Sequence, residues 1–93
     1  MKTSNYVVVY DISSDSERRR VEKSLHSFGF RVQKSVFECR LTKRGKKALI
    51  KKLEALNIKT GFIKIYRLEY SWEKCIIGKK GYETPDEDSS YIV

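Results

Sequence analysis

The chain is poor in the residues that small proteins use for cross-links and for metal-free acid–base catalysis. It has two cysteines, Cys39 and Cys75, without Cys-x-x-Cys spacing, and a single histidine, His26. Two thiols are too few for a structural zinc site. One histidine cannot act as both the acid and the base of a metal-free ribonuclease unless another group assists it. We therefore expect unpaired cysteines and a reducing, cytoplasmic location.

Long apolar runs and nucleotide-binding glycine patterns are also missing. The apolar run Val7–Val9 is short and is soon followed by Asp11, so it does not resemble a signal peptide. No segment is long enough to cross a bilayer, and we expect no membrane partner. The sequence has no P-loop, no dinucleotide-binding glycine motif and no Gly-x-Ser-x-Gly elbow, which argues against the corresponding enzyme classes.

Negative charge is scarce except at the C-terminal end. Residues 1–82 contain all 20 lysines and arginines against 8 acids, a net charge of +12, whereas residues 83–93 contain 4 acids and no base. The high positive charge of residues 1–82 favours a polyanionic partner, most simply a nucleic acid, over a purely solubilising role of these bases. The acidic tail either lies on this basic surface or recruits a second, basic partner.

The hydrophobic pattern predicts elements in the order β-α-β-β-α-β. The predicted strands cover residues 5–12, 30–33, 35–41 and 61–70, and the predicted helices cover residues 14–28 and 42–56. This order is that of an α+β, ferredoxin-like sandwich with both helices on one face of the sheet. We expect residues 1–78 to form this domain, with a short fifth strand near Trp72–Ile77, and residues 79–93 to form a C-terminal acidic tail.

Local signals place the ends of the two helices. The run from Ser14 to Glu17 fits the capping box that begins a helix, and Gly29 is expected to end it near Phe28. Thr42 is a suitable cap for the second helix, which is expected to end near Leu56.

Asp11 is the first candidate for chemistry. It follows a β-branched and aromatic strand, where a charge is not needed for packing and is costly unless it is paired. One interpretation is a metal-binding carboxylate beside a phosphate backbone. The other is a turn-forming aspartate that accepts hydrogen bonds from backbone amides. A single carboxylate is a poor magnesium site, but a two-fold dimer would bring a second Asp11 to the same place.

Basic side chains cluster on both predicted helices. Arg18 and Arg20 lie in the first turns of one helix, where the helix dipole disfavours cations, so they indicate a bound anion such as phosphate. The second helix carries six bases against one acid, which predicts a surface that follows a nucleic-acid backbone. Its bases are Lys43, Arg44, Lys46, Lys47, Lys51 and Lys52. We single out Lys47 and Lys51 as nucleic-acid contacts.

Together, several segments resemble the small CRISPR-associated proteins of spacer acquisition, the Cas2 family. They are Tyr-Val-Val-Val-Tyr-Asp-Ile at 6–12, Arg18–Val21, the Phe28-Gly29 helix end, and Val-Gln-Lys-Ser-Val-Phe-Glu-Cys at 32–39. The resemblance covers about residues 5–70. It implies a homodimer whose last strand is exchanged between protomers and which, with the CRISPR integrase subunit, acts as a scaffold for duplex DNA. It also implies a metal-dependent endonuclease that acts on DNA or single-stranded RNA.

The resemblance also assigns roles to individual residues. It implies that Asp11 is the catalytic and metal-binding carboxylate for Mg²⁺ or Mn²⁺. Tyr10, Arg18, Arg20, Arg31 and Phe37 match the family's nucleic-acid-binding positions. In this mechanism two Asp11 carboxylates across the dimer axis hold one ion, which activates a water, while the arginines hold the backbone.

Two other functions remain open from the sequence. One is a stand-alone, toxin-type RNA interferase, which would cleave single-stranded RNA without a partner. The other is a non-catalytic nucleic-acid-binding module, which would bind single strands tightly without metal. Binding to a long duplex with a steep salt dependence favours the adaptation subunit over both.

Overall fold

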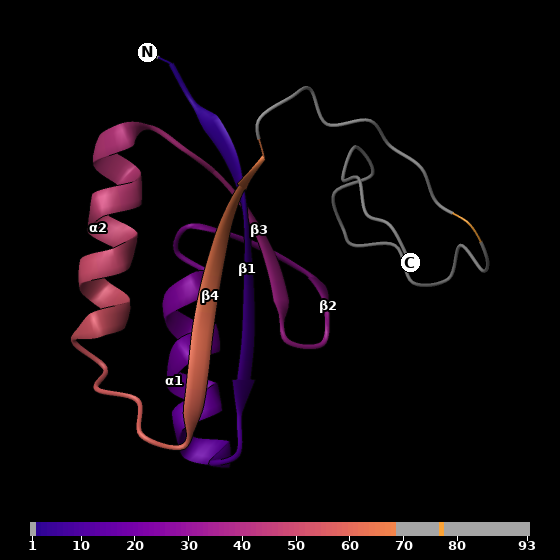
Figure 1. Cartoon of the computed structure of the whole chain (residues 1–93), viewed down its shortest axis with the longest axis vertical. Coiled ribbons are helices and arrows are strands. Elements are labelled where there is room, and N and C mark those ends of the chain that lie inside the picture. The colour runs from indigo at the N-terminus through magenta and orange to yellow at the C-terminus, as the bar shows by residue number, and fades with distance from the viewer. Residues whose placement is uncertain (1, 69–76, 78–93) are drawn as a thin grey trace.

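The computed structural model describes residues 2–68 and residue 77. Its strands are β1 (Ser4–Ile12), β2 (Gly29–Gln33), β3 (Val36–Leu41) and β4 (Gly61–Leu68), and its helices are α1 (Asp15–Leu25) and α2 (Lys43–Glu54). The strands form one antiparallel sheet in the order β2-β3-β1-β4 (Figure 1). Among the described strands, β1 therefore lies inside the sheet and β4 lies at an edge.

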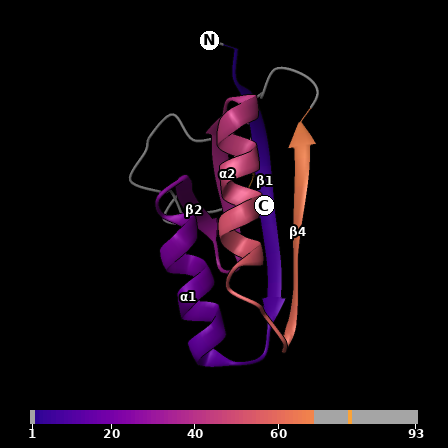
Figure 2. The ribbon, with the colours of Figure 1, turned by 90° about the vertical axis from the view of Figure 1, so that its left-hand side faces the viewer.

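Alternation along β1 separates the two faces of the sheet. Tyr6, Val8, Tyr10 and Ile12 are buried, and the residues between them are half-buried or exposed. Both helices cover the buried face (Figure 2). The core between the layers includes Val21 and Leu25 of α1, Phe37, Cys39 and Leu41 of β3, and Leu49 and Leu53 of α2. No helix within residues 2–68 covers the other face, which we call the open face.

Each helix begins at the residue that the sequence indicates. The Ser14 hydroxyl accepts a hydrogen bond from the Glu17 N–H at 3.3 Å, and the Thr42 hydroxyl accepts one from the Gly45 N–H at 3.0 Å. These bonds satisfy amides that would otherwise have no partner in the first turn.

The helices end slightly earlier than the sequence predicts. α1 ends at Leu25 rather than near Phe28, because the Phe28 N–H bonds to the carbonyl of Leu25, three residues back, and tightens the chain into a turn. α2 ends at Glu54, and Asn57 then adopts a left-handed φ of 53°. Asn tolerates this conformation, which stops the helix.

The predicted β-α-β-β-α-β order and the ferredoxin-like arrangement are confirmed. The predicted fifth strand, except for Ile77, and the acidic tail of residues 79–93 lie outside the described residues. None of the helices in the described part of the chain is both long and apolar enough to cross a membrane.

Candidate metal and nucleic-acid site

Asp11 lies near the end of β1 on the open face of the sheet. It is exposed between the buried Tyr10 and Ile12, and it is paired with Phe62 of β4. Because successive side chains of a strand point to opposite faces, Asp11 faces away from the core that contains its two neighbours. Its carboxylate is therefore presented at one end of the open face.

The chain turns at Ser13 and Ser14, directly after β1, and we call this turn with Asp11 and Ile12 the Asp11 corner. Its backbone amides do not use the Asp11 carboxylate as a hydrogen-bond acceptor. The Ser13 N–H donates to the Thr60 carbonyl at 3.0 Å, and the Ser14 N–H donates to the Thr60 hydroxyl at 3.0 Å. Among the described residues, no hydrogen bond or ion pair involves the Asp11 side chain. The geometry therefore does not support the interpretation of Asp11 as a turn-forming residue, and no described residue occupies either of its carboxylate oxygens.

Glu17 of α1 holds Thr60 in this position. The side chain is 8% exposed. Its carboxylate accepts hydrogen bonds from the Thr60 hydroxyl at 2.6 Å, from the Thr60 N–H at 3.0 Å and from the Lys59 N–H at 3.0 Å. These donors, the Thr60 hydroxyl first, hold the pKa of Glu17 below its ordinary value of 4.5. Glu17 thus bonds the segment before β4 instead of the Ser14 N–H that a capping box would give it.

Gly61 brings β4 unusually close to the backbone of Asp11. A Cβ placed on Gly61 would lie 1.8 Å from the Asp11 carbonyl oxygen and 2.8 Å from the Ile12 Cα. Real side chains do not approach so closely, so only glycine allows this approach. The three residues Thr60, Gly61 and Glu17 therefore fix the Asp11 corner from both sides.

The three predicted arginines lie at different places. Arg18 is at the Asp11 corner, where its Nη1 donates to the Ile12 carbonyl at 3.0 Å and its Nη2 pairs with Asp15. Arg20 donates to the Leu56 carbonyl beyond α2 at 3.4 Å, and Arg31 is exposed on β2 at the far edge of the sheet. Of the three, Arg18 alone donates a hydrogen bond to a residue next to Asp11.

Tyr10 and Phe37 lie in the core, where they do not reach a nucleic acid. They are 2% and 0% exposed, and their ring centroids are 6.4 Å apart. The His26 ring also packs edge-on against Phe37, with its centroid at 4.9 Å. The predicted contacts of these two side chains with nucleic acid are therefore corrected. The alternation that exposes Asp11 buries Tyr10, and Phe37 shares the buried face through its pairing with Val8.

The Tyr10 hydroxyl has a structural partner. It donates a hydrogen bond to Glu22 Oε2 of α1 at 2.6 Å. Burial, and then this bond to an acidic group, raise the pKa of Tyr10 well above its ordinary value. Tyr10 therefore stays protonated and ties α1 to β1.

The described residues of one chain provide only part of a metal site. No group of three His, Cys, Asp or Glu side chains that could hold an ion lies within residues 2–68. The other acidic groups of the corner are occupied, since Asp15 pairs with Arg18 and Glu17 bonds the Thr60 segment. A free carboxylate is a ligand of the kind that Mg²⁺ and Mn²⁺ prefer. Asp11 therefore fits a divalent cation as one contribution to a site that needs further oxygen ligands.

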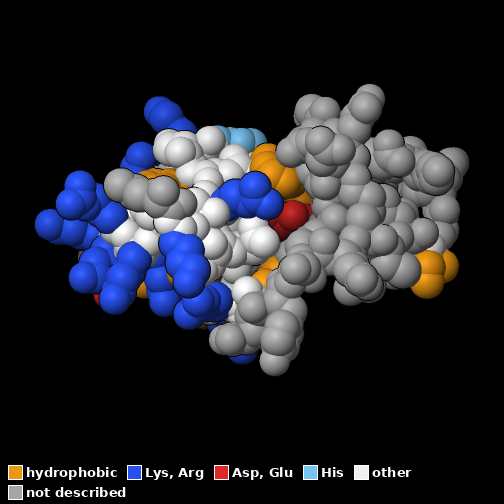
Figure 3. Space-filling model, turned by 90° about the horizontal axis from the view of Figure 1, so that it is seen from above, with side chains coloured by type: hydrophobic (Ala, Val, Ile, Leu, Met, Phe, Trp, Pro, Cys, Tyr) orange, Lys and Arg blue, Asp and Glu red, His pale blue; other side chains and the backbone are white. Residues whose placement is uncertain are grey.

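Basic side chains cover the outer side of the helical layer. Lys43, Arg44, Lys47, Lys51 and Lys52 of α2 are exposed. Figure 3, which looks down on the molecule of Figure 1, shows lysine and arginine side chains gathered on the side where the helices lie. Lys47 and Lys51 are thus accessible to a polyanion, as a nucleic-acid contact requires.

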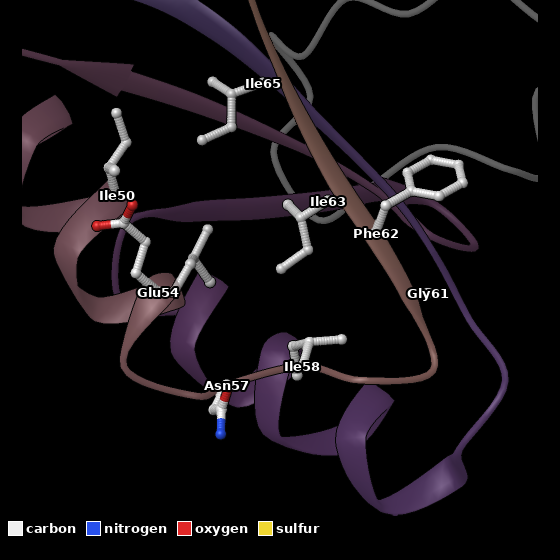
Figure 4. Close-up of a pocket in the computed structure, with 9 residues that line it drawn as sticks. Ile50, Glu54, Asn57, Ile58, Gly61, Phe62, Ile63 and Ile65 are labelled. Atoms are coloured by element: carbon white, nitrogen blue, oxygen red, sulfur yellow. The ribbon is translucent and has the colours of Figure 1, made fainter.

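An apolar groove of about 540 Å³ lies between α2 and β4. Ile63 and Ile65 point into it from β4, whereas Phe62 points away to the open face (Figure 4). Ile50 and Leu53 of α2 line the opposite wall. The groove therefore runs beside the edge of the described sheet.

The sequence did not reveal the roles of Thr60, Glu17 and Gly61. A glycine at the start of a strand is a weak signal of close backbone approach. The bonds between Glu17 and Thr60 join residues that are 43 positions apart, so no local spacing could have indicated them.

Comparison with known proteins yields one family. The model of the family described as CRISPR associated protein Cas2 matches residues 4–75. A hypothetical protein from Thermus thermophilus, whose crystal structure is known, has the same fold with a TM-score of 0.73 and 32% identity. That alignment covers 84% of this chain and 96% of that chain.

The sequence relatives include proteins that are named as enzymes. CRISPR-associated endoribonuclease Cas2 4 of Rhodospirillum rubrum is 45% identical over 64 residues, which are 68% of this chain and 52% of that protein. CRISPR-associated endoribonuclease Cas2 of Thermus thermophilus is 38% identical over 92 residues, which are 92% of this chain and 98% of that protein. The chain thus spans about half the length of the first relative and nearly all of the second.

Proposed function

Because the chain belongs to the CRISPR associated protein Cas2 family, we propose that it is a spacer-acquisition subunit with metal-dependent endonuclease activity. In this proposal a homodimer binds duplex DNA as a scaffold for the CRISPR integrase subunit in the cytoplasm. The same dimer hydrolyses phosphodiester bonds in RNA or DNA. The names of the relatives favour RNA as the cleaved substrate.

The free Asp11 carboxylate is the observation that carries the catalytic part of the proposal. The corner around it is fully bonded without it, and it faces the open side of the sheet. An exposed charge that the fold does not use fits a group that binds something else. We propose that Asp11 binds Mg²⁺ or Mn²⁺ together with Asp11 of a second copy and with water or substrate oxygens.

The open face supports the proposed homodimer. Phe62 and Tyr66 are 46% and 52% exposed there, and Val7, Val9 and Val36 are only half-buried. Two copies that pack these faces together about a two-fold axis would cover this apolar surface and bring their Asp11 ends to the same interface. The groove beside β4 is a suitable place for apolar side chains of the exchanged strand, which we propose comes from residues 72–77 of the other copy.

The chemistry assigns distinct tasks to the residues of the corner. Hydrolysis adds water across a P–O bond, and a bound divalent ion would polarise the phosphate and lower the pKa of the attacking water. Asp11 would supply an anionic oxygen to hold the ion. Arg18, which bonds the Ile12 carbonyl and pairs with Asp15, would contribute cationic charge to attract the phosphate.

The scaffold part of the proposal depends on α2. If a dimer neutralises roughly 6–10 phosphates, its affinity for duplex DNA should fall steeply as the salt concentration rises. A plot of the logarithm of the affinity against the logarithm of the salt concentration should have a slope of about −5 to −9. The double charge reversal Lys47→Glu with Lys51→Glu should weaken binding to all sequences alike. The matched double reversal Lys34→Glu with Lys2→Glu changes the charge equally on other elements and should weaken it less. Equal losses would show that net charge alone acts.

The experiment on catalysis uses Asp11→Asn, with Glu54→Gln as a control that removes an exposed carboxylate from α2. Cleavage of RNA and of DNA is measured with Mg²⁺ and with Mn²⁺, after each preparation has been checked for contaminating nuclease. We expect Asp11→Asn to lose cleavage while it keeps its fold and its duplex binding, and Glu54→Gln to cleave as the wild type does. Equal cleavage by wild type and Asp11→Asn would refute the catalytic role of Asp11.

One observation favours a non-catalytic scaffold as the second candidate. The described residues of a single chain offer one free carboxylate at this corner, which is few ligands for a divalent ion. If neither wild type nor Asp11→Asn cleaves, and both support integration by the integrase subunit, the function is that of the scaffold alone.

A further inference from the structure

The backbone at the Asp11 corner has two amides that an aspartate in this position would ordinarily bind. An Asp before a turn commonly accepts hydrogen bonds from N–H groups two or three residues further on. Here those groups belong to Ser13 and Ser14, and both donate to Thr60 instead. Thr60 comes from the segment before β4, so the acceptors that replace Asp11 are supplied by a distant part of the chain.

Glu17 determines the orientation of Thr60. The Thr60 hydroxyl donates to Glu17 Oε1 at 2.6 Å, so its lone pairs are left to accept the Ser14 N–H. The Thr60 N–H donates to the same Glu17 oxygen at 3.0 Å. The hydroxyl thus has both its donor and its acceptor roles satisfied, which fixes its rotamer.

We propose that Thr60 and Glu17 are positioning residues that keep the Asp11 carboxylate free for a divalent cation by supplying the corner with other acceptors. The inference rests on the proposed metal-binding role of Asp11. Without the Thr60 hydroxyl, the Ser14 N–H loses its partner, and two carboxylates, Asp11 and Glu17, lie three residues from it in the sequence. Glu17 still accepts the Lys59 and Thr60 N–H groups, whereas Asp11 bonds to no other described residue, so Asp11 can take this amide without breaking a described bond. A carboxylate that turns inward to bind this amide is withdrawn from the cation.

The first test measures the affinity of the full-length protein for Mn²⁺ by calorimetry. Thr60→Val removes the hydroxyl and preserves the branched shape, Thr60→Ser keeps the hydroxyl as a matched control, and Thr60→Ala replaces Thr60→Val if the latter does not fold. We expect Thr60→Val to bind Mn²⁺ about tenfold more weakly, which corresponds to the competition of one hydrogen bond. Thr60→Ser should bind as the wild type does, and duplex binding in EDTA should be the same for all variants.

The second test needs no metal and measures the coupling between residues 11 and 60. Asp11→Ala is made in the wild type and in Thr60→Val, and the melting temperature of each protein is measured in EDTA. In the wild type Asp11→Ala should change the melting temperature little, because Asp11 bonds to no other described residue. In Thr60→Val the same change should lower it clearly, because Asp11 has become the acceptor of the corner.

The outcomes separate this inference from the proposed function. If wild type binds no Mn²⁺, or if Asp11→Asn binds it equally well, the metal role of Asp11 fails, and the melting temperatures alone decide whether Thr60 frees the carboxylate. If Asp11→Asn abolishes Mn²⁺ binding while Thr60→Val binds as wild type does, the positioning role is overturned. Additive melting-temperature changes for Asp11→Ala and Thr60→Val would overturn it as well.

Discussion

Phe37 offers the sharpest contrast between a binding residue and a core residue. Its side chain is fully buried between Tyr10 and His26. Replacement of a buried Phe by Ala costs about 3–5 kcal/mol, out of the roughly 5–15 kcal/mol that stabilise a typical domain. Phe37→Leu keeps most of the apolar volume and should cost roughly 1–2 kcal/mol. We expect both variants to be less stable than the wild type, and Phe37→Ala to lose more stability than Phe37→Leu.

The assay combines urea unfolding at one fixed protein concentration with duplex and single-strand binding well below the unfolding transition. The folded Phe37→Leu protein should bind nucleic acid as the wild type does. A base stacked on an aromatic ring contributes about 1–3 kcal/mol, so a binding role would instead weaken the affinity by about fivefold or more. If Phe37→Leu were as stable as the wild type and showed such a loss of affinity, the assignment of Phe37 to the core would be refuted.

Three further results are expected from buried or bonded groups. Tyr10→Phe removes the 2.6 Å hydrogen bond to Glu22 and should lower the unfolding free energy by roughly 1–2 kcal/mol, with no change in nucleic-acid binding measured on the folded protein. The lowered pKa of Glu17 contributes stability above its unfolded value of 4.5, and this contribution is lost as the pH falls through that value and the lower folded one. Glu17→Gln should therefore unfold more easily than wild type at pH 6, and the difference should shrink at pH 3 in denaturant titrations. Burial raises the pKa of the Cys39 thiol to about 11, so in a Cys75→Ser protein a thiol reagent at pH 8 should react only after denaturation.

The sequence predicts the elements of this fold well because each depends on local chemistry. The alternation along β1 and the caps Ser14 and Thr42 all act within a few residues, and the structure has each of them. Helix ends are less predictable, because α1 stops at Leu25 when the chain tightens, although Phe28 still packs against the core. The predicted capping box is only half formed, since Glu17 makes its main bonds with Thr60, far along the chain.

Alternation also explains why the predicted site residues separate in the fold. Tyr10 and Asp11 are neighbours in sequence, and a motif treats them as one site, but adjacent residues of a strand cannot face the same side. Phe37 pairs with Val8 across the sheet and shares its buried face. The two-residue period of a strand, applied to the motif, is by itself enough to place Asp11 and Tyr10 on opposite faces. The burial of Phe37 depends in addition on the pairing of β3 with β1, which no local pattern contains.

The exposure of Asp11 has a consequence for assembly. Within the described residues, each chain supplies only the Asp11 carboxylate to the proposed site, so an ion held by two Asp11 side chains binds the dimer more tightly than it binds a monomer. Linkage then requires that the ion strengthen the dimer by the same factor by which dimerisation strengthens ion binding. The Thr60 hydroxyl affects this linkage within each protomer. A carboxylate that bonds the Ser14 N–H cannot bind the ion, so the ion then strengthens the dimer less. In the proposed dimer, the hydrogen bonds between α1 and the segment before β4 thereby affect an equilibrium between two chains.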